Sequence, residues 1–382
     1  MHQFFSSIQE TMNYVVPFLI VLGLVVFVHE AGHFLAARLF GVRVETFSIG
    51  FGRELFGWND RRGTRWKIAW LPLGGYVKMF GDSDPASSGA DEKVADFTEE
   101  EKKQAFYTQK VGKRFAIVFA GPLGNYLFAV LVMAALFTAA GRPYTPPVVD
   151  KVIENSVAAQ AGLKAGDVIL TIGGSKIGSF EDIKRAISLN MGTEVEISFD
   201  RDGAKRTVTL TPEVVITTDR FGGKHKTGRV GIVSTRQEYL KLPIGEALQA
   251  AVGETWSLSV STLKGVGQMI IGVRGADELG GPLRIAEMSG QVAKDGLAAF
   301  VWFLAVISVN LGLINLFPIP LLDGGHLVFY LIEGVRGRPL SEQAQEAGAR
   351  IGLLLLVSLM LFATWNDLVH LRVVSYLRSL FS

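Results

Sequence analysis

The sequence contains no cysteine among its 382 residues. A framework of disulfide bonds and a zinc site built from thiolates are therefore excluded, and any metal site must use histidine and carboxylate ligands. The six histidines that could serve are His2, His29, His33, His225, His326 and His370. The sequence also lacks a run of basic residues, so nothing in it indicates nucleic-acid binding.

Charged residues are scarce, at 19% of the chain, whereas hydrophobic residues make up 49%. This balance is typical of a membrane protein that carries soluble insertions. Long apolar stretches predict about four transmembrane helices, at residues 14–40, 115–140, 297–317 and around 351–365. The first stretch lacks the charged start and the cleavage site of a signal peptide, so we expect it to be retained.

The first apolar stretch contains His29-Glu-Ala-Gly-His33, which is the pattern H-E-x-x-H. On a helix, residues i and i+4 share one face, so both imidazoles can bind one metal ion. Glu30 is placed to act as the general base that takes a proton from a water molecule. Ionisable side chains at membrane depth are costly and usually functional. The structural alternative is a pair of packed histidines and a glutamate at a helix end.

The segment after the first span is rich in positive charge near its membrane ends. By the positive-inside rule it is cytoplasmic, which places the H-E-x-x-H pattern near the cytoplasmic face. Within it, residues 42–52 and 64–79 are predicted to form strands because they are rich in β-branched and aromatic residues. They form either a small cytoplasmic hairpin or a membrane-associated hairpin that approaches the metal and offers an edge strand to a substrate.

Residues 142–215 read as a soluble insertion on the extracytoplasmic side. Strand, short helix, strand, helix and a hairpin with an Asp202-Gly203 turn follow one another, and the insertion resembles a PDZ domain of α/β type. Such a domain binds peptide C-termini or extended segments by adding a strand to its sheet. A plug that binds nothing is the alternative. Residues 241–296 are predicted to form amphipathic helices on the outer membrane surface. A spanning helix is the less favoured alternative, because it would reverse the topology.

A third metal ligand is expected after the third span. Catalytic zinc usually takes three protein ligands, and the carboxyl ends of the first and third spans lie at the same depth. Asp323 is the favoured candidate because it stands on a turn between prolines and glycines, and His326 is the alternative. Asn310 and Asn315 lie on the approach to Asp323 and either hold substrate backbone or bond neighbouring helices.

Taken together, these motifs resemble those of bacterial site-2 proteases, the intramembrane zinc metalloproteases of regulated intramembrane proteolysis, here in a single-PDZ form similar to the regulator of sigma-E protease. The resemblance rests on residues 29–33, 50–52, 73–79, on Gly121-Pro122 with Asn125, and on residues 315–324. It implies that His29, His33 and Asp323 bind one Zn²⁺ and that Glu30 is catalytic. It also implies substrate contacts from the β segment and the third span, at Asn315, Asn310, Pro318, Gly74, Gly75 and Tyr76.

The expected fold class is a polytopic α-helical membrane protein with a membrane-associated β element and an inserted PDZ domain. The predicted divisions are residues 1–40, 41–114, 115–140, 142–216, 217–296, 297–332, 345–370 and 371–382. The first, third, sixth and seventh divisions hold the spans, the second the β element and a linker, the fourth the PDZ domain, and the fifth a tail and the surface helices. The last division is a C-terminal tail. The tandem PDZ pair of the enterobacterial regulator of envelope stress is not matched, because the chain has room for one complete PDZ domain.

The predicted function is hydrolysis of peptide bonds within transmembrane segments of single-span proteins, such as anti-sigma factors or remnant signal peptides. The expected location is the inner membrane of a bacterial cell, with the PDZ domain periplasmic. One alternative is a membrane-anchored PDZ module with an inactive metal site. A metal transporter is disfavoured because no internal repeat is evident, and a tethered soluble protease is disfavoured because the motif lies inside the apolar stretch.

Overall fold

The computed structural model describes residues 2–82, 96–218, 224–236, 238–272, 275 and 280–370. The chain divides into two compact units, each with its own hydrophobic core. We call residues 1–135, 247–264 and 276–382 the membrane unit, and residues 136–246 and 265–275 the inserted unit. Part of the predicted linker, residues 83–95, and the predicted tail, residues 371–382, lie outside the described residues.

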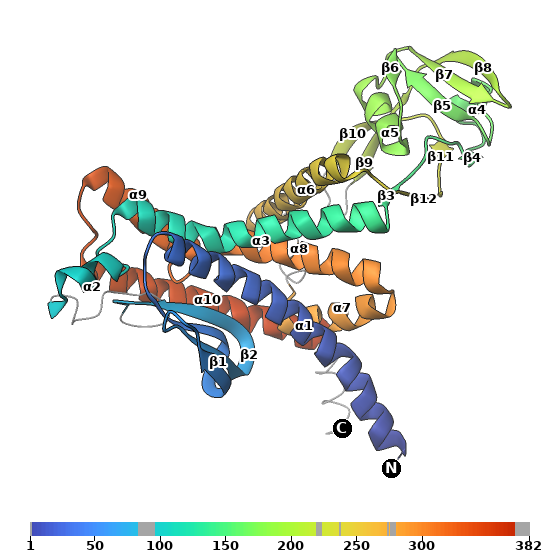
Figure 1. Ribbon diagram of the computed structural model, residues 1–382. Helices are drawn as coiled ribbons and strands as arrows, with labels where there is room; N and C mark the ends of the chain where they lie inside the picture. The colour runs from blue at the N-terminus through green and yellow to red at the C-terminus, as the bar shows by residue number, and fades with distance from the viewer. Residues whose placement is uncertain are drawn as a thin grey trace. The chain divides into compact units, whose positions relative to one another are not determined.

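Helices make up most of the membrane unit (Figure 1). They are α1 (His2–Leu39), α2 (Glu99–Gln104), α3 (Val111–Ala139), α6 (Ile244–Ile270), α7 (Pro282–Lys294), α8 (Leu297–Asn315), α9 (Asp323–Arg336) and α10 (Glu342–His370). Among the described residues, four stretches are long and apolar enough to cross a membrane, namely Met12–Leu39, Val111–Ala139, Leu297–Asn315 and Gln343–Val369. They coincide with the four predicted spans, and the fourth is longer than its strictly apolar centre.

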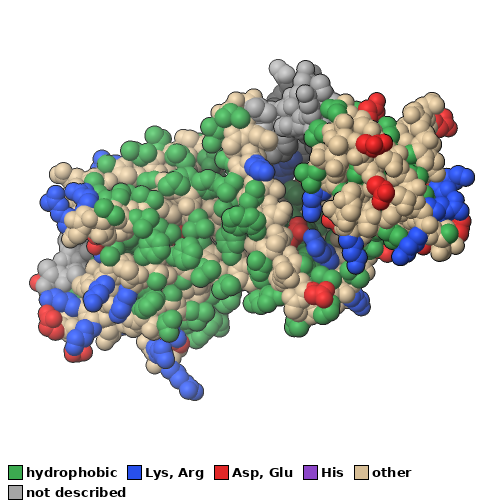
Figure 2. Space-filling model, turned by 90° about the horizontal axis from the view of Figure 1, so that it is seen from above, with side chains coloured by type: hydrophobic (Ala, Val, Ile, Leu, Met, Phe, Trp, Pro, Cys, Tyr) green, Lys and Arg blue, Asp and Glu red, His purple; other side chains and the backbone are tan. Residues whose placement is uncertain are grey.

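Hydrophobic side chains cover most of the visible face of the membrane unit, and Lys and Arg side chains gather at one of its ends (Figure 2). That end holds α2 and the C-terminal part of α9 (Figure 1). A broad apolar band bounded by positive charge is the pattern that the positive-inside rule describes. The helices of the membrane unit therefore present the surface expected of a membrane protein.

Glycines allow α1 and α3 to cross in close contact. A Cβ built on Gly32 of α1 would overlap the carbonyl oxygen of Ala120 and lie 2.8 Å from its carbonyl carbon. A Cβ built on Gly124 of α3 would lie 3.1 Å from the carbonyl oxygen of Val28. Small residues at such crossings bring helix backbones together in membranes. This contact fixes the position of α1 along α3, and with it the position of His29 and His33 relative to α3.

The β element consists of β1 (Val44–Asn59) and β2 (Arg65–Met79). The second strand matches the prediction for residues 64–79, whereas β1 continues to Asn59, beyond the predicted end at residue 52. Both strands bend back, so residues 46–49 pair with 75–78 on one side and with 65–68 on the other. Residues 56–59 pair with 65–68 as well. Gly50 has a φ of +90°, a conformation that favours glycine and lets β1 change direction. Within the described residues, segment 71–79 is thus an edge of this small sheet.

The end of α1 is joined to the β element by aromatic and charged contacts. Phe34 packs edge-on against Trp66, with ring centroids 5.0 Å apart, and Phe47 stacks on Trp66 at 4.3 Å. The guanidinium of Arg38 pairs with Asp60 in the turn between the strands and donates to the hydroxyl of Thr64. The β element therefore has a defined orientation relative to the helix that carries H-E-x-x-H.

Helix α6 lies within the segment predicted to form amphipathic helices on the membrane surface, and it packs against α3. Its residues Thr255 and Ser259 pack against the span α3, where Thr255 contacts Met133 and Ser259 contacts the hydroxyl of Tyr126 at 3.1 Å. The helix thus lies lengthwise along α3 and not across its end. The apolar residues that suggested an amphipathic helix are exposed, among them Leu248, Val252, Trp256 and Leu263. The buried face is built from small residues four apart, at Ala247, Ala251, Thr255 and Ser259.

The inserted unit contains two short helices and ten strands among its described residues. They are β3 (Arg142–Tyr144), β4 (Lys151–Val152), α4 (Val157–Gln160), β5 (Val168–Ile172), β6 (Ser175–Lys176), α5 (Phe180–Leu189), β7 (Val195–Arg201), β8 (Ala204–Leu210), β9 (Glu213–Thr218), β10 (Lys224–Arg229), β11 (Ile232–Val233) and β12 (Glu238–Leu240). Its main sheet has the order β6-β5-β7-β8. The predicted order of elements is present, and Asp202 and Gly203 both have positive φ, as a two-residue hairpin turn requires.

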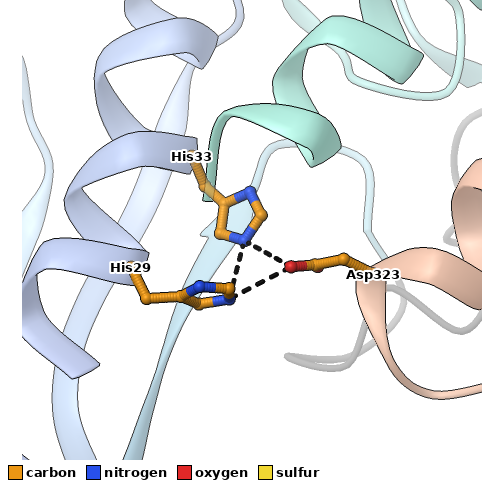
Figure 3. A group of neighbouring side chains, drawn as sticks. All are labelled: His29, His33 and Asp323. Carbon is orange, nitrogen blue, oxygen red and sulfur yellow. Dashed lines mark hydrogen bonds and ion pairs between the residues drawn. The ribbon is translucent and has the colours of Figure 1, made fainter. Parts of the chain in front are cut away.

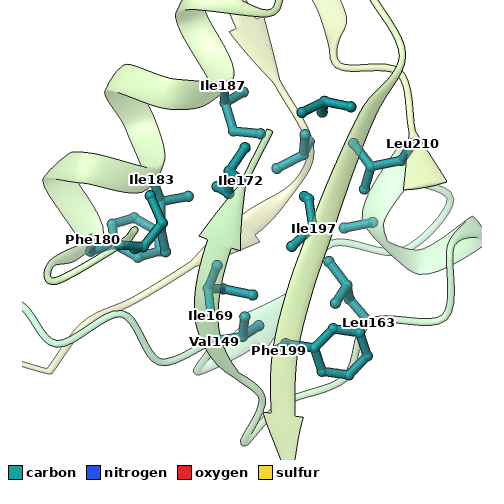
Figure 4. Close-up of a cluster of buried hydrophobic side chains, with 14 residues drawn as sticks. Val149, Leu163, Ile169, Ile172, Phe180, Ile183, Ile187, Ile197, Phe199 and Leu210 are labelled. Carbon is teal, nitrogen blue, oxygen red and sulfur yellow. The ribbon is translucent and has the colours of Figure 1, made fainter. Parts of the chain in front are cut away.

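The core of the inserted unit lies between α5 and the sheet (Figure 4). Phe180, Ile183 and Ile187 of α5 face Ile172 of β5 and Ile197 of β7. Val230 is also buried in this core, and β11 pairs with β4 through Ile232 and Val152. The packed core therefore continues beyond the predicted division at residue 216, and we propose a domain boundary after residue 233.

Candidate metal centre

Three side chains from two distant segments converge in the membrane unit (Figure 3). The Nε2 atoms of His29 and His33 lie 3.3 Å apart. Asp323 Oδ2 lies 3.1 Å from Nε2 of His29 and 3.4 Å from Nε2 of His33. These are the residues that the sequence and the family resemblance selected as ligands. Among the described residues they form the one group of this kind that could hold a metal ion.

The orientation of His33 is fixed by its second ring nitrogen. Nδ1 of His33 lies 3.0 Å from the backbone carbonyl oxygen of Ile117 on α3, so Nδ1 carries the proton and donates it. Nε2 is then left unprotonated and directed at His29 and Asp323. A hydrogen bond of this kind behind a histidine is the usual device that orients a metal ligand.

Asp323 is placed by a tight turn at the start of α9. A Cβ built on Gly324 would overlap the carbonyl oxygen of Phe317, and one built on Gly325 would lie 2.5 Å from that of Ile319. The two glycines after Asp323 therefore let the helix start directly against the preceding chain. The carboxylate occupies the first turn of α9, where the helix dipole favours a negative charge.

The residues present fit a zinc ion. The buried Oδ2 of Asp323 has no hydrogen-bond partner, which is costly for a carboxylate oxygen unless a cation binds it. A tetrahedral zinc ion with bonds of about 2.0 to 2.1 Å holds neighbouring ligand atoms about 3.3 to 3.4 Å apart. The three distances between the ligand atoms, 3.1 to 3.4 Å, are close to this spacing. Two imidazoles and one carboxylate also leave a fourth position for water.

Glu30 lies beside this group, and the β element reaches it. Glu30 is buried on α1 next to His29. A Cβ built on Gly75 of β2 would lie 3.0 Å from Cγ of Glu30, 2.9 Å from Cγ1 of Val26 and 2.7 Å from the carbonyl oxygen of Ser48. Only a glycine fits between α1 and β1 at this point. The edge segment of the sheet is thus packed against the candidate general base.

Most of the other residues predicted to contact substrate have partners of their own. Asn310 accepts a hydrogen bond from the hydroxyl of Thr262 on α6 at 3.0 Å, and Nδ2 of Asn315 donates to the carbonyl oxygen of Leu311 at 3.1 Å. Tyr76 stacks on Phe51. Gly74 lies under the same ring, since a Cβ there would come within 3.1 Å of its Cζ. Pro318 is exposed on the turn before Asp323.

His326, the alternative third ligand, is not part of the group formed by His29, His33 and Asp323. Its ring packs against Phe329, with centroids 6.4 Å apart. The side chains of His2, His225 and His370 lie outside the described part of the chain. Sequence reasoning did not single out Ile117, whose carbonyl orients His33, because a backbone contact between two helices leaves no trace in residue type.

The sequence pattern of Peptidase family M50 matches residues 17–359 of the chain. The chain belongs to peptidase family M50. The M50 chain is 46% identical over 363 residues to a protein of Agrobacterium fabrum that carries the provisional name of zinc metalloprotease, covering 94% of this chain and 96% of that protein. It is 37% identical over 391 residues to the protein of Caulobacter vibrioides named Metalloprotease MmpA, and the match covers 96% of this chain and 98% of that protein.

A relative from Rhizobium meliloti with the same provisional name is 42% identical over 369 residues, which cover 95% of this chain and 98% of that protein. The M50 chain is therefore a metalloprotease, and its cofactor is zinc. Similar solved structures include the PDZ domain of an SdrC-like protein from Listeria monocytogenes, at 22% identity and a TM-score of 0.19, covering 24% of this chain and 90% of that one.

Proposed function

We propose that this M50 peptidase cleaves peptide bonds inside transmembrane segments of single-span membrane proteins, in regulated intramembrane proteolysis. Anti-sigma factors and remnant signal peptides are the expected classes of substrate. The observation that carries the proposal is the position of His29 and His33, which lie within the candidate span Met12–Leu39 and share their site with Asp323. A hydrolytic site at that depth serves a substrate that is itself in the membrane.

The proposed roles follow from the geometry. His29, His33 and Asp323 hold zinc, which when bound activates a water molecule and polarises the scissile carbonyl. Glu30 accepts a proton from the water as its oxygen attacks the carbonyl carbon. Glu30 then passes the proton to the amide nitrogen as the C–N bond breaks, which yields a free carboxylate and a free amine. The burial of Glu30 keeps its carboxylate away from bulk water.

A helical substrate must unwind first, because its carbonyls are bonded within the helix. Edge segment 71–79 offers unpaired backbone groups to an extended chain next to Glu30, which would offset part of the cost of unwinding. Gly74, Gly75 and Tyr76 belong to this segment. The outer part of the β element exposes Leu55, Phe56, Trp58 and Trp70, side chains suited to the membrane interface.

Asn310, Asn315 and Pro318 form the proposed opposite wall of the substrate path. In the described structure the amide oxygen of Asn310 is bonded by Thr262, so substrate binding exchanges this bond for one to the substrate backbone. Asn315 has spare bonding capacity, because an amide side chain has two donors and one acceptor and its amide nitrogen makes a single bond within α8.

The inserted unit is proposed to bind peptide C-termini or extended segments at β11, as a PDZ domain does. Its carbonyl groups at Gly231 and Val233 accept from Ile153 and Asp150, so the backbone groups of Ile232 point away from β4. Within the described part of the chain, β4 is the strand paired with β11. The proposed location is the bacterial inner membrane, with the inserted unit in the periplasm and the metal site toward the cytoplasm.

The test is to map the cleaved bond. Purified protein in detergent is incubated with single-span substrates, and the products are identified by mass spectrometry. A cut inside the hydrophobic segment supports the proposal, and the cut should be faster when helix-breaking residues are introduced near the bond. Cleavage confined to segments outside the membrane would show that the protein is a metalloprotease of another kind.

A further inference from the structure

The turn before Asp323 is packed on its far side by α10. A Cβ built on Gly352 of α10 would overlap the carbonyl oxygen of Pro320 and lie 2.7 Å from its carbonyl carbon and 2.9 Å from its Cβ. Gly352 is buried. One turn earlier, a Cβ on Gly348 would lie 3.1 Å from Cζ of Phe329 and 3.7 Å from Cγ of Pro320. The backbone of α10 at Gly348 and Gly352 thus packs directly against Pro320.

Gly348 and Gly352 make a G-x-x-x-G pattern in α10. In spanning helices this pattern marks a face on which another backbone packs closely. Here that backbone is the turn that leads into Asp323, three residues beyond Pro320. Gly325 of α9 packs against the same turn, since a Cβ built on Gly325 would lie 2.7 Å from Cα of Pro320. Pro320 is therefore enclosed between two glycine backbones.

The backbone of this turn is strained. Leu321 has a φ of +78°, a conformation that side chains larger than glycine rarely adopt. Such a residue persists only where its surroundings enforce it, and strain of this kind gathers at functional sites. Leu321 lies two residues before Asp323. The conformation of the turn is thus determined by its packing against α9 and α10 and not by its own preference.

We propose that Gly348 and Gly352 are positioning residues for Asp323, and that α10 is a structural part of the metal centre. The proposal rests on the proposed zinc site. Gly352 packs against Pro320 and so fixes the position of the turn that begins there. That turn leads into Asp323, so its position sets the distance from Asp323 to His29 and His33. Zinc sites tolerate changes of about 0.2 Å in their ligand distances. A methyl group on residue 352 displaces the Pro320 carbonyl by more than that, because neither a helix backbone nor a proline turn yields easily.

The experiment measures zinc affinity by competition with a chelator of known affinity, on full-length protein in detergent. Gly352→Ala is expected to bind zinc roughly 10-fold to 100-fold more weakly, as is usual when support behind a ligand is lost. Gly348→Ala is expected to lose less, because the ring of Phe329 can move aside. Gly334→Ala on α9 is the matched control, since a Cβ there meets nothing within 4 Å. It is expected to bind zinc as the wild type does.

The melting temperature of each zinc-free protein separates positioning from general packing, because a packing defect lowers stability without changing the affinity of the folded protein. Gly→Ala raises helix propensity, so a weaker α10 is no explanation for lost affinity. Wild-type zinc affinity in Gly352→Ala overturns the proposal. If Gly352→Ala does not fold, Gly348→Ala decides, and affinity equal to that of Gly334→Ala overturns it. Wild-type affinity in Asp323→Ala would instead refute the proposed zinc site itself.

Discussion

Gly121 of α3 lies directly against the imidazole of His33 on α1. A Cβ at residue 121 would overlap the ring and come within 2.9 Å of its Cδ2. Four residues earlier on the same helix, the carbonyl of Ile117 accepts the Nδ1 proton of His33. One turn of α3 therefore holds one proposed metal ligand by both contact and hydrogen bond, and the second span is a part of the candidate metal centre.

Gly121→Ala is expected to weaken zinc binding roughly 10-fold to 100-fold, because the added methyl pushes the ring of His33 away from His29 and Asp323. Zinc content after dialysis against graded chelator measures the change. Gly112→Ala near the start of the same helix is the control, because a Cβ there meets nothing within 4 Å. Equal retention of zinc by the two variants would contradict the role given to Gly121.

Arg114→Met is expected to destabilise the membrane unit by about 3 kcal/mol. Arg114 pairs with Glu333 of α9, and its guanidinium lies over the ring of Tyr330, 4.9 Å from the centroid. Both charges are largely buried, so removal of one leaves the other without compensation. Thermal unfolding in detergent measures the effect. Arg350→Gln, which breaks an exposed pair with Glu346, should cost less than about 1 kcal/mol.

The stability of the β element is expected to depend on pH in the acid range because of Asp60. Its pKa is lowered to about 2, because burial, which raises the pKa, is outweighed by hydrogen bonds from the Trp66 indole and the backbone of Thr64. The folded pKa lies below the value of 3.8 for a free aspartate, so the carboxylate stabilises the fold above about pH 4. That contribution is lost as the pH falls from about 4 to about 2.

Unfolding of wild type and Asp60→Asn should therefore be compared across this range. The wild type is expected to be more stable than Asp60→Asn near neutral pH, and the difference should shrink as the pH falls below 4. Glu99→Gln, at an exposed site on α2, should follow the wild type. A stability difference that stays constant from pH 7 to pH 2 would show that the titration of Asp60 is not the cause.

Much of the site could be predicted from the sequence because its spacing is local or topological. The i, i+4 spacing of His29 and His33 fixes one edge of the ligand triangle within a single helix. Asp323 followed from the expectation that the first and third spans end at the same depth. The strands of the β element were also predicted, whereas their double pairing was not, because it depends on where Gly50 turns the chain.

The parts that were not predicted involve packing between helices. The apolar side chains of α6 suggested an amphipathic helix but did not show which residues contact α3, and the structure buries the small residues Ala247, Ala251, Thr255 and Ser259. Apolar side chains next to lipid gain little from burial, so small residues determine which faces of helices meet. The contacts of Gly121 and Gly352 could not be predicted for the same reason, since the sequence does not indicate which residue packs against a glycine in an apolar helix.

The most direct test of the account compares wild type and Glu30→Gln for zinc content and for cleavage of a single-span substrate in detergent. Because Glu30 is proposed to accept a proton and not to bind the metal, both proteins are expected to hold about one zinc per chain. Only the wild type should cleave the substrate, with a loss of at least roughly 100-fold in the variant. Cleavage at the wild-type rate by Glu30→Gln would contradict the proposed mechanism.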